Sequence, residues 1–178
     1  MADNFIYGIG FMIGLLVAMV IVLLCVYTKT RKGTNTHYDE RQVLARGNAY
    51  KVSFIVAMFY MIFCLLAELF DLKWALLTMQ MLIGILLSCA VFIIMCIFTN
   101  AYFGVNQKNS IAYIVILAII GLMNVGVGIR NLCMGESPFT NGALNGGSMN
   151  LLVATFLFII DIALIIKVIL EKRASVEE

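Results

Sequence analysis

Residues 37–51 read HYDERQVLARGNAYK, and this stretch is the only long polar run between two hydrophobic segments of the chain. Around it the composition is strongly apolar: hydrophobic residues make up 63% of the 178 residues and charged residues only 12%. A soluble domain carries roughly 25% charged residues. Uncharged apolar runs long enough to cross a hydrocarbon core of about 30 Å recur along the chain. We therefore expect an all-α, multi-spanning membrane protein.

Working outward from the polar stretch, we predict five transmembrane helices, at residues 5–27, 51–70, 75–98, 111–129 and 151–170. Residues 28–50 are expected to form a cytoplasmic juxtamembrane helix, and residues 130–150 an extracytoplasmic loop. Asp39 and Gln42 have the spacing of a capping box, which predicts a helix start near Tyr38. The residues that follow favour a helix, so this helix is expected to run straight into the second span.

The positive charges predict the orientation of the bundle. Ten of the twelve Lys and Arg residues fall on one side of this topology, and only Lys73 and Arg130 fall on the other. Loops rich in Lys and Arg stay in the cytoplasm, so we expect the N-terminus outside and the C-terminus inside. The first apolar run has no basic start and ends in Lys29-Thr30-Arg31-Lys32. It is therefore expected to be a retained span and not a cleaved signal peptide.

The sequence contains no pattern that predicts chemistry. It has one His, and its five Cys residues are scattered, so a zinc or transition-metal site is not expected. It lacks a serine-hydrolase elbow, a zincin motif and a phosphate-binding P-loop. We therefore expect no enzyme activity, no cofactor and no metal. Direct contact with nucleic acid is not expected either.

Asp161 lies near the middle of the fifth predicted span, where an ionised carboxylate costs about 2.5–3.5 kcal/mol. On one interpretation it is a proton or cation site, because hydrocarbon favours the neutral carboxyl group and makes its ionisation switchable. On the other, it is a protonated residue that hydrogen-bonds a neighbouring helix and holds the bundle together. The polar residues expected to pair with it are Tyr60, Gln80, Ser88 and Asn124.

Small residues recur at helical spacing in the predicted spans, as in Gly10-x-x-x-Gly14 or Gly121, Asn124 and Gly128. Such faces let helices approach closely in lipid, so helix packing is favoured over a permeation path. Gly10-x-x-x-Gly14 could also join two copies in a homo-oligomer. The spacing Gly-x-x-x-Lys-x-Ser occurs at residues 47–53 and again at residues 104–110. A duplication would give two tandem helical hairpins, but chance recurrence in so biased a sequence is the favoured interpretation.

Residues 130–150 contain the only proline, Pro138, and several Gly, Asn and Ser residues. This composition is compatible with a segment that recognises a ligand. A flexible connector is the interpretation that the composition favours.

The polar stretch has two interpretations of its own. Its basic residues set the topology and face an anionic leaflet, where each cation contributes about 1 kcal/mol. Mere anchoring does not require the directional polar groups that the stretch also contains, which suggests a docking site for a membrane or cytosolic protein. The residues of this predicted docking site are Asp39, Glu40, Arg41, Gln42 and Arg46.

These residues also carry a resemblance to a known family. Asp39-Glu40-Arg41-Gln42, followed by Arg46-Gly47-x-Ala49-Tyr50-Lys51 and an apolar span, resembles the "DERQ" integral membrane proteins of unknown function from Firmicutes-type bacteria. The resemblance implies a bacterial cytoplasmic membrane and no known enzymatic activity. Some such proteins are thought to be encoded beside small DNA-binding regulators, which implies a membrane partner or an immunity role.

From the sequence we therefore predict a non-enzymatic bacterial membrane protein whose cytoplasmic juxtamembrane helix docks a partner in a regulatory or immunity-type role. The alternative is a small transporter, or a proton- or ion-conducting subunit, that uses Asp161. The two hypotheses differ in whether the polar stretch or the middle of the bundle is the functional site.

Overall fold

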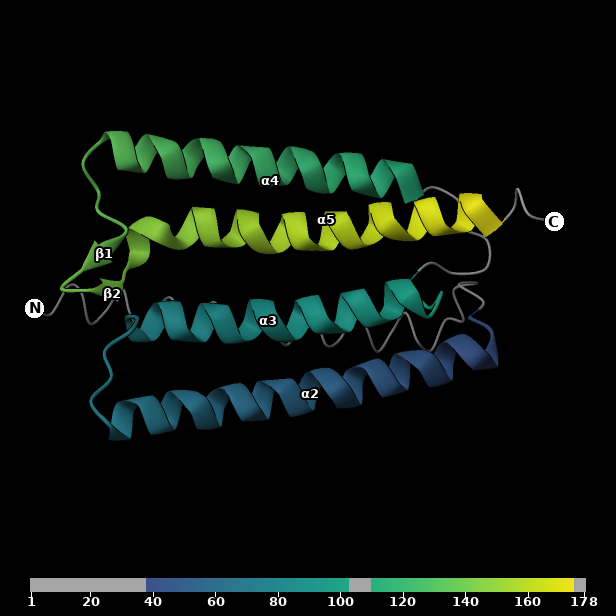
Figure 1. The fold of residues 1–178 in the computed structure, drawn as a ribbon, viewed down its shortest axis with the longest axis horizontal. Coiled ribbons are helices and arrows are strands. Elements are labelled where there is room, and N and C mark those ends of the chain that lie inside the picture. Colours follow the sequence, from purple (N-terminus) through teal and green to yellow (C-terminus); the bar gives the residue numbers. More distant parts are fainter. Residues whose placement is uncertain (1–37, 103–109, 175–178) are drawn as a thin grey trace, which may run out of the picture. The chain divides into compact units, whose positions relative to one another are not determined.

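The computed structural model describes residues 38–102 and 110–174. Within these residues four helices are long and apolar enough to cross a membrane: α2 (Glu40–Leu69), α3 (Leu77–Phe98), α4 (Ser110–Cys133) and α5 (Met149–Ala174) (Figure 1). Each overlaps one of the last four predicted spans. Large apolar side chains are exposed along all four helices, as expected for surfaces that face lipid. An all-α, multi-pass membrane protein is confirmed, while the predicted span at residues 5–27 lies outside the described residues.

The start of α2 matches the predicted capping box. Asp39 is the N-cap residue, and its backbone N–H donates to Oε1 of Gln42 over 3.3 Å. Such reciprocal caps satisfy N–H groups that the first helical turn leaves unpaired. From Glu40 the helix continues without a break to Leu69. Residues 40–50 therefore belong to the same helix as the second span, and the rest of the predicted juxtamembrane segment lies outside the described residues.

Three of the helices end in the same local structure. The residues that follow the C-caps of α2, α3 and α4 are left-handed: Asp71 (φ 55°), Asn100 (φ 56°) and Gly135 (φ 88°). At the end of α2 the N–H groups of Asp71 and Leu72 donate to carbonyls in the last turn, over 3.1 and 2.8 Å. This pattern is a Schellman motif, which satisfies the final carbonyl groups and stops the helix. The chain can then reverse within a few residues.

The helices pack as two hairpins. α2 lies against α3, α4 lies against α5, and the two pairs meet where α3 contacts α5 (Figure 1). This arrangement agrees with the two tandem hairpins that a duplication would give. Because Gly104 and Lys108 lie outside the described residues, the structure shows the two hairpins but does not test the repeated spacing.

Small residues bring the paired helices together. A Cβ atom at Gly84 of α3 would lie 2.8 Å from the ring of Tyr60 on α2. A Cβ atom at Gly121 of α4 would lie 2.9 Å from the ring of Phe158 on α5. Real side chains avoid such distances, so these glycines admit a large side chain from the facing helix. The structure thus favours helix packing as the role of these small residues.

Residues 130–150, predicted as a flexible connector, contain short regular elements that the sequence analysis did not predict. After α4 the chain forms a hairpin of β1 (Phe139–Thr140) and β2 (Ala143–Leu144), followed by a short 3-10 helix, η1 (Gly146–Ser148). The two turn residues, Asn141 and Gly142, have φ angles of 51° and 81°, as a type I′ turn requires. The Leu144 N–H donates to the Trp74 carbonyl over 3.0 Å. Backbone hydrogen bonds thus join this segment to the α2–α3 connection, at what we call the hairpin end of the bundle.

Candidate functional sites

Asp161 is the buried carboxylate of the described bundle. It lies near the middle of α5 and is 5% exposed. Its Oδ1 atom is buried and has no hydrogen-bond partner among the residues that the structure describes. A buried polar group without a partner loses its hydration and gains nothing in return. Burial at this position therefore disfavours the ionised form of the carboxyl group.

The helix register explains what surrounds this carboxylate. Gly121 faces Phe158, and Gly128 faces Leu151, so α4 and α5 run antiparallel with a fixed offset. Extended by three residues, this offset places Asp161 at the level of Ala118, an apolar residue of α4. The nearest basic residue on its own helix, Lys167, is paired with Glu171 over 3.4 Å. No charged side chain within the described helices is thus placed to neutralise Asp161.

The four residues predicted to pair with Asp161 form other hydrogen bonds, so that prediction was wrong. Each donates to a main-chain carbonyl on its own or the neighbouring helix or connection. The bonds are Tyr60 Oη to Gln80 O at 2.7 Å, Gln80 Nε2 to Ala75 O at 2.9 Å, Ser88 Oγ to Gly84 O at 2.8 Å, and Asn124 Nδ2 to Ile120 O at 2.9 Å.

Geometry accounts for this outcome. Asn124 lies six positions from Ala118, which is about 9 Å along a helix that rises 1.5 Å per residue. Tyr60 belongs to α2, which packs against α3 and not extensively against α5. The sequence indicated that these residues are polar and intramembrane, but it contained no information on the register between helices.

The polar start of α2 makes contacts within the chain. Gln42 Nε2 donates to the Asn100 carbonyl over 2.7 Å, and Arg46 Nη1 donates to the Ala101 carbonyl over 3.5 Å. Both acceptors follow the C-terminal end of α3, where the helix dipole favours a positive charge. The Arg46 guanidinium also lies 4.5 Å from the centre of the Tyr38 ring, a cation–π distance.

The predicted docking residues are therefore divided between two environments. Asp39, Gln42 and Arg46 take part in the cap and in the contact with the end of α3. Glu40 and Arg41 are exposed, and neither forms an ion pair with another described residue. Only this adjacent pair of opposite charges is left available to a partner.

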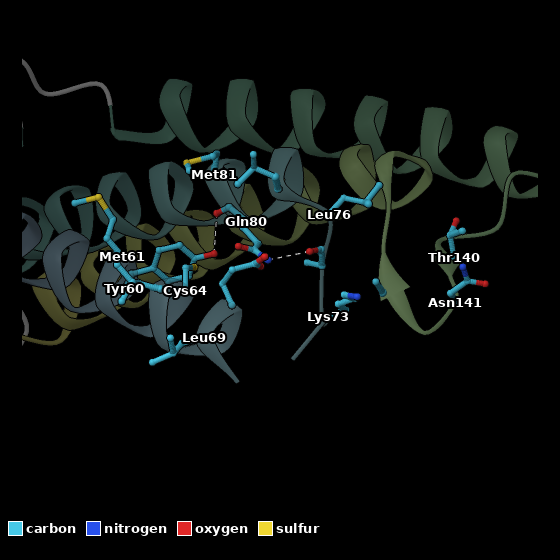
Figure 2. Close-up of a pocket in the computed structure, with 15 residues that line it drawn as sticks. Tyr60, Met61, Cys64, Leu69, Lys73, Leu76, Gln80, Met81, Thr140 and Asn141 are labelled. Carbon is cyan, nitrogen blue, oxygen red and sulfur yellow. Dashed lines mark hydrogen bonds between the residues drawn. The ribbon is translucent and has the colours of Figure 1, made fainter. Parts of the chain in front are cut away.

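A pocket of about 1,210 Å³ lies at the hairpin end, where the last turns of α2, the first turns of α3 and the turn between β1 and β2 meet. Figure 2 shows side chains from these segments around it, including Tyr60, Met61, Met81 and Asn141. The sequence analysis missed this pocket. The Asn-Gly pair at 141–142 was the available signal, because it is the strongest short-range indication of a β-hairpin.

Neither a metal site nor a known relative indicates a role for these sites. Within residues 38–102 and 110–174, no group of three or more His, Cys, Asp or Glu side chains could hold a metal ion. No protein-family model, curated protein or solved structure matches the chain. The resemblance of residues 39–51 to the DERQ proteins therefore stays a prediction.

Proposed function

We propose that this chain is a small bacterial membrane transporter, or a proton- or ion-conducting subunit, in which Asp161 binds a proton or a small cation. The observation that carries the proposal is the buried Oδ1 atom of Asp161, which has no hydrogen-bond partner among the described residues. The proposal includes a non-enzymatic protein with five helices in the cytoplasmic membrane, the N-terminus outside and the C-terminus inside, as the distribution of Lys and Arg predicts.

An intramembrane carboxyl group can have a structural role or an ion-binding role. A structural carboxyl group stabilises a bundle by donating a hydrogen bond to another helix, and such bonds contribute about 0.6 kcal/mol on average. The buried Oδ1 atom of Asp161 makes no such bond to any described residue. A carboxyl group that binds a proton or cation must instead remain free to exchange it, at a cost in stability that function can justify.

The packing suggests where exchange takes place. Asp161 lies three residues after Phe158, whose ring meets Gly121 of α4. A small separation of α4 from α5 would admit water to the carboxyl group and allow it to ionise. Closing the interface would again favour the neutral or cation-bound form.

The test is a flux assay in liposomes that contain purified protein. A potassium gradient with valinomycin drives protons, and a trapped pH dye reports their movement. Wild-type protein should conduct, and Asp161→Asn should not, because the amide keeps the size of the side chain but cannot ionise. Asp71→Asn is the matched control, since Asp71 is 83% exposed and lies outside the helices. Absence of flux in the wild type for protons, Na⁺ and K⁺, at any pH, would refute the proposal.

The second candidate function is docking of a protein partner on the exposed Glu40–Arg41 pair. The specific observation in its favour is that these two charges make no ion pair within the described chain, although Gln42 and Arg46 beside them bond the chain after α3. Arg41→Lys keeps the charge but removes planar, bidentate hydrogen bonding, so it should weaken partner recovery from native membranes. Arg46→Lys is the control, because Arg46 bonds the Ala101 carbonyl within the chain and its replacement alters the fold contact, not the proposed docking pair. Equal recovery with Arg41→Lys, Glu40→Gln and wild type would exclude this function.

A further inference from the structure

The pocket at the hairpin end has an apolar interior. Its walls include Met61 of α2, Met81 of α3 and Leu76 of the preceding connection (Figure 2). Methionine side chains are flexible and polarisable, so such walls adapt to ligands of different shape. The volume of about 1,210 Å³ exceeds the 300–1,000 Å³ typical of sites for drug-sized molecules. A bulky apolar group therefore fits.

The inner end of the pocket holds polar atoms in fixed positions. Tyr60 Oη donates to the Gln80 carbonyl over 2.7 Å, and Gln80 Nε2 donates to the Ala75 carbonyl over 2.9 Å (Figure 2). The Tyr60 ring also packs against Gly84, which leaves no room for a Cβ atom. These contacts preorganise an aromatic face in the pocket wall. An aromatic face attracts a cation by about 0.5–2 kcal/mol, depending on how far the pair is desolvated.

Two charged side chains line the pocket, Lys73 and Glu68. Lys73 is already paired with Asp71, with Nζ and Oδ1 3.2 Å apart. Glu68 also lines the pocket, and it makes no ion pair with any residue in the described part of the chain. Glu68 lies in the last turn of α2, where the helix dipole disfavours a negative charge. Glu68 is therefore an exposed carboxylate at the rim of the pocket that no ion pair within the described chain engages.

We propose that this pocket binds amphipathic organic cations, with the positive group on the Glu68 carboxylate and the apolar part against Tyr60, Met61 and Met81. The ligand class is an amine, quaternary ammonium or phosphonium that carries a bulky hydrophobic group. Its positive charge would form an ion pair with the Glu68 carboxylate, and its apolar surface would fill the space between α2 and α3. This inference does not depend on Asp161, which lies on a different pair of helices.

The experiment compares two probes of nearly equal shape and opposite charge. Tetraphenylphosphonium is the cation and tetraphenylborate is the anion, and both are titrated into full-length protein in uncharged dodecyl maltoside micelles. Equilibrium dialysis gives the Kd. The fluorescence of Trp74, the only Trp of the chain, reports the location, because Trp74 directly precedes the pocket residue Ala75.

Three variants isolate the carboxylate. Glu68→Gln should weaken phosphonium binding about tenfold or more, the loss expected for one charge-assisted contact. Glu68→Asp should retain most of the affinity. Glu136→Gln is the matched control, because Glu136 is exposed and does not line the pocket; it should bind as the wild type does.

The outcomes are distinct from one another. Saturable phosphonium binding with a parallel change in Trp74 fluorescence, at least tenfold tighter than borate binding, supports the proposal. Equal binding of the two probes would mean that the pocket accepts any apolar molecule, such as a lipid chain, and would overturn it. Unchanged affinity in Glu68→Gln would overturn it as well. The probe comparison needs only wild-type protein, so it stands even where a variant does not fold.

Discussion

Replacing Gly128 with alanine tests the α4–α5 interface, whose offset sets the level of Asp161 against α4. An added Cβ atom at Gly128 would lie 2.6 Å from Cγ of Leu151 and 3.4 Å from its backbone nitrogen. Favourable contacts between carbon atoms lie at about 3.5–4.0 Å, so the helices or the Leu151 side chain must move by about 1 Å. Overpacking of this kind costs about 1–3 kcal/mol.

Gly126, one half-turn away, provides the control. A Cβ atom there meets nothing within 4 Å. Both substitutions gain about 1 kcal/mol of helix propensity, so this gain cancels when the two variants are compared. We therefore expect Gly128→Ala to be less stable than Gly126→Ala by about 1–3 kcal/mol.

The free energy of unfolding is measured by titrating the protein from maltoside into SDS micelles and following helicity by circular dichroism. A second experiment makes Gly128→Ala in a Leu151→Ala background. The leucine atoms that the new Cβ would meet are then absent, so the loss of stability should be smaller. Equal stability of the two glycine variants, or the same cost in both backgrounds, would refute the close approach of α4 and α5 and with it the offset that places Asp161 at the level of Ala118.

Three further predictions concern other parts of the chain. Gln42→Glu keeps an acceptor for the capping box but removes the N–H donor to the main chain after α3, so it should destabilise the protein by about 1 kcal/mol in the same SDS titration, and equal stability would contradict the contact. Burial raises the pKa of the Tyr102 phenol above 10.0, so the folded state retains a proton that the unfolded state loses. The free energy of unfolding should therefore fall as the pH rises above about 10, and Tyr102→Phe should reduce this fall. In a chain with the other cysteines replaced, an impermeant thiol reagent should label Cys133 in intact cells and Thr36→Cys only after lysis, and the reverse pattern would invert the proposed orientation.

The helical part of the fold was largely predictable from the sequence, since it depends on local properties. Apolar runs without charge predicted α3, α4 and α5 to within a few residues, and the spacing of Asp39 and Gln42 predicted the start of α2. The β-hairpin was missed although Asn141-Gly142 is a strong local signal. Gly, Asn and Ser are typical both of flexible connectors and of tight turns, and the composition of the whole segment obscured the one pair that matters.

The candidate sites were less predictable, because they depend on contacts between segments distant in sequence. The pocket requires the turn at Asn141 to reach the ends of α2 and α3. Gln42 was assigned to a partner, but its side chain is used twice within the chain: Oε1 accepts from the Asp39 N–H, and Nε2 donates to the Asn100 carbonyl. A glutamine can do both, whereas the glutamate common in capping boxes cannot. This part of the polar stretch therefore stabilises the fold.

The polar residues inside the helices show why Asp161 differs from the rest. Ser53, Ser88, Asn124 and Thr155 each donate to the carbonyl four residues earlier in their own helix, over 2.8–2.9 Å. A hydroxyl or amide donor can always find this acceptor one turn back, so such residues are tolerated in lipid without any partner helix. An ionised carboxylate has no N–H or O–H to donate, and the helix interior offers it no free N–H. An ionised Asp161 therefore differs from these serine, threonine and asparagine residues, because the main chain of its own helix offers it no hydrogen bond, and this difference is the basis of the proposed proton or cation site.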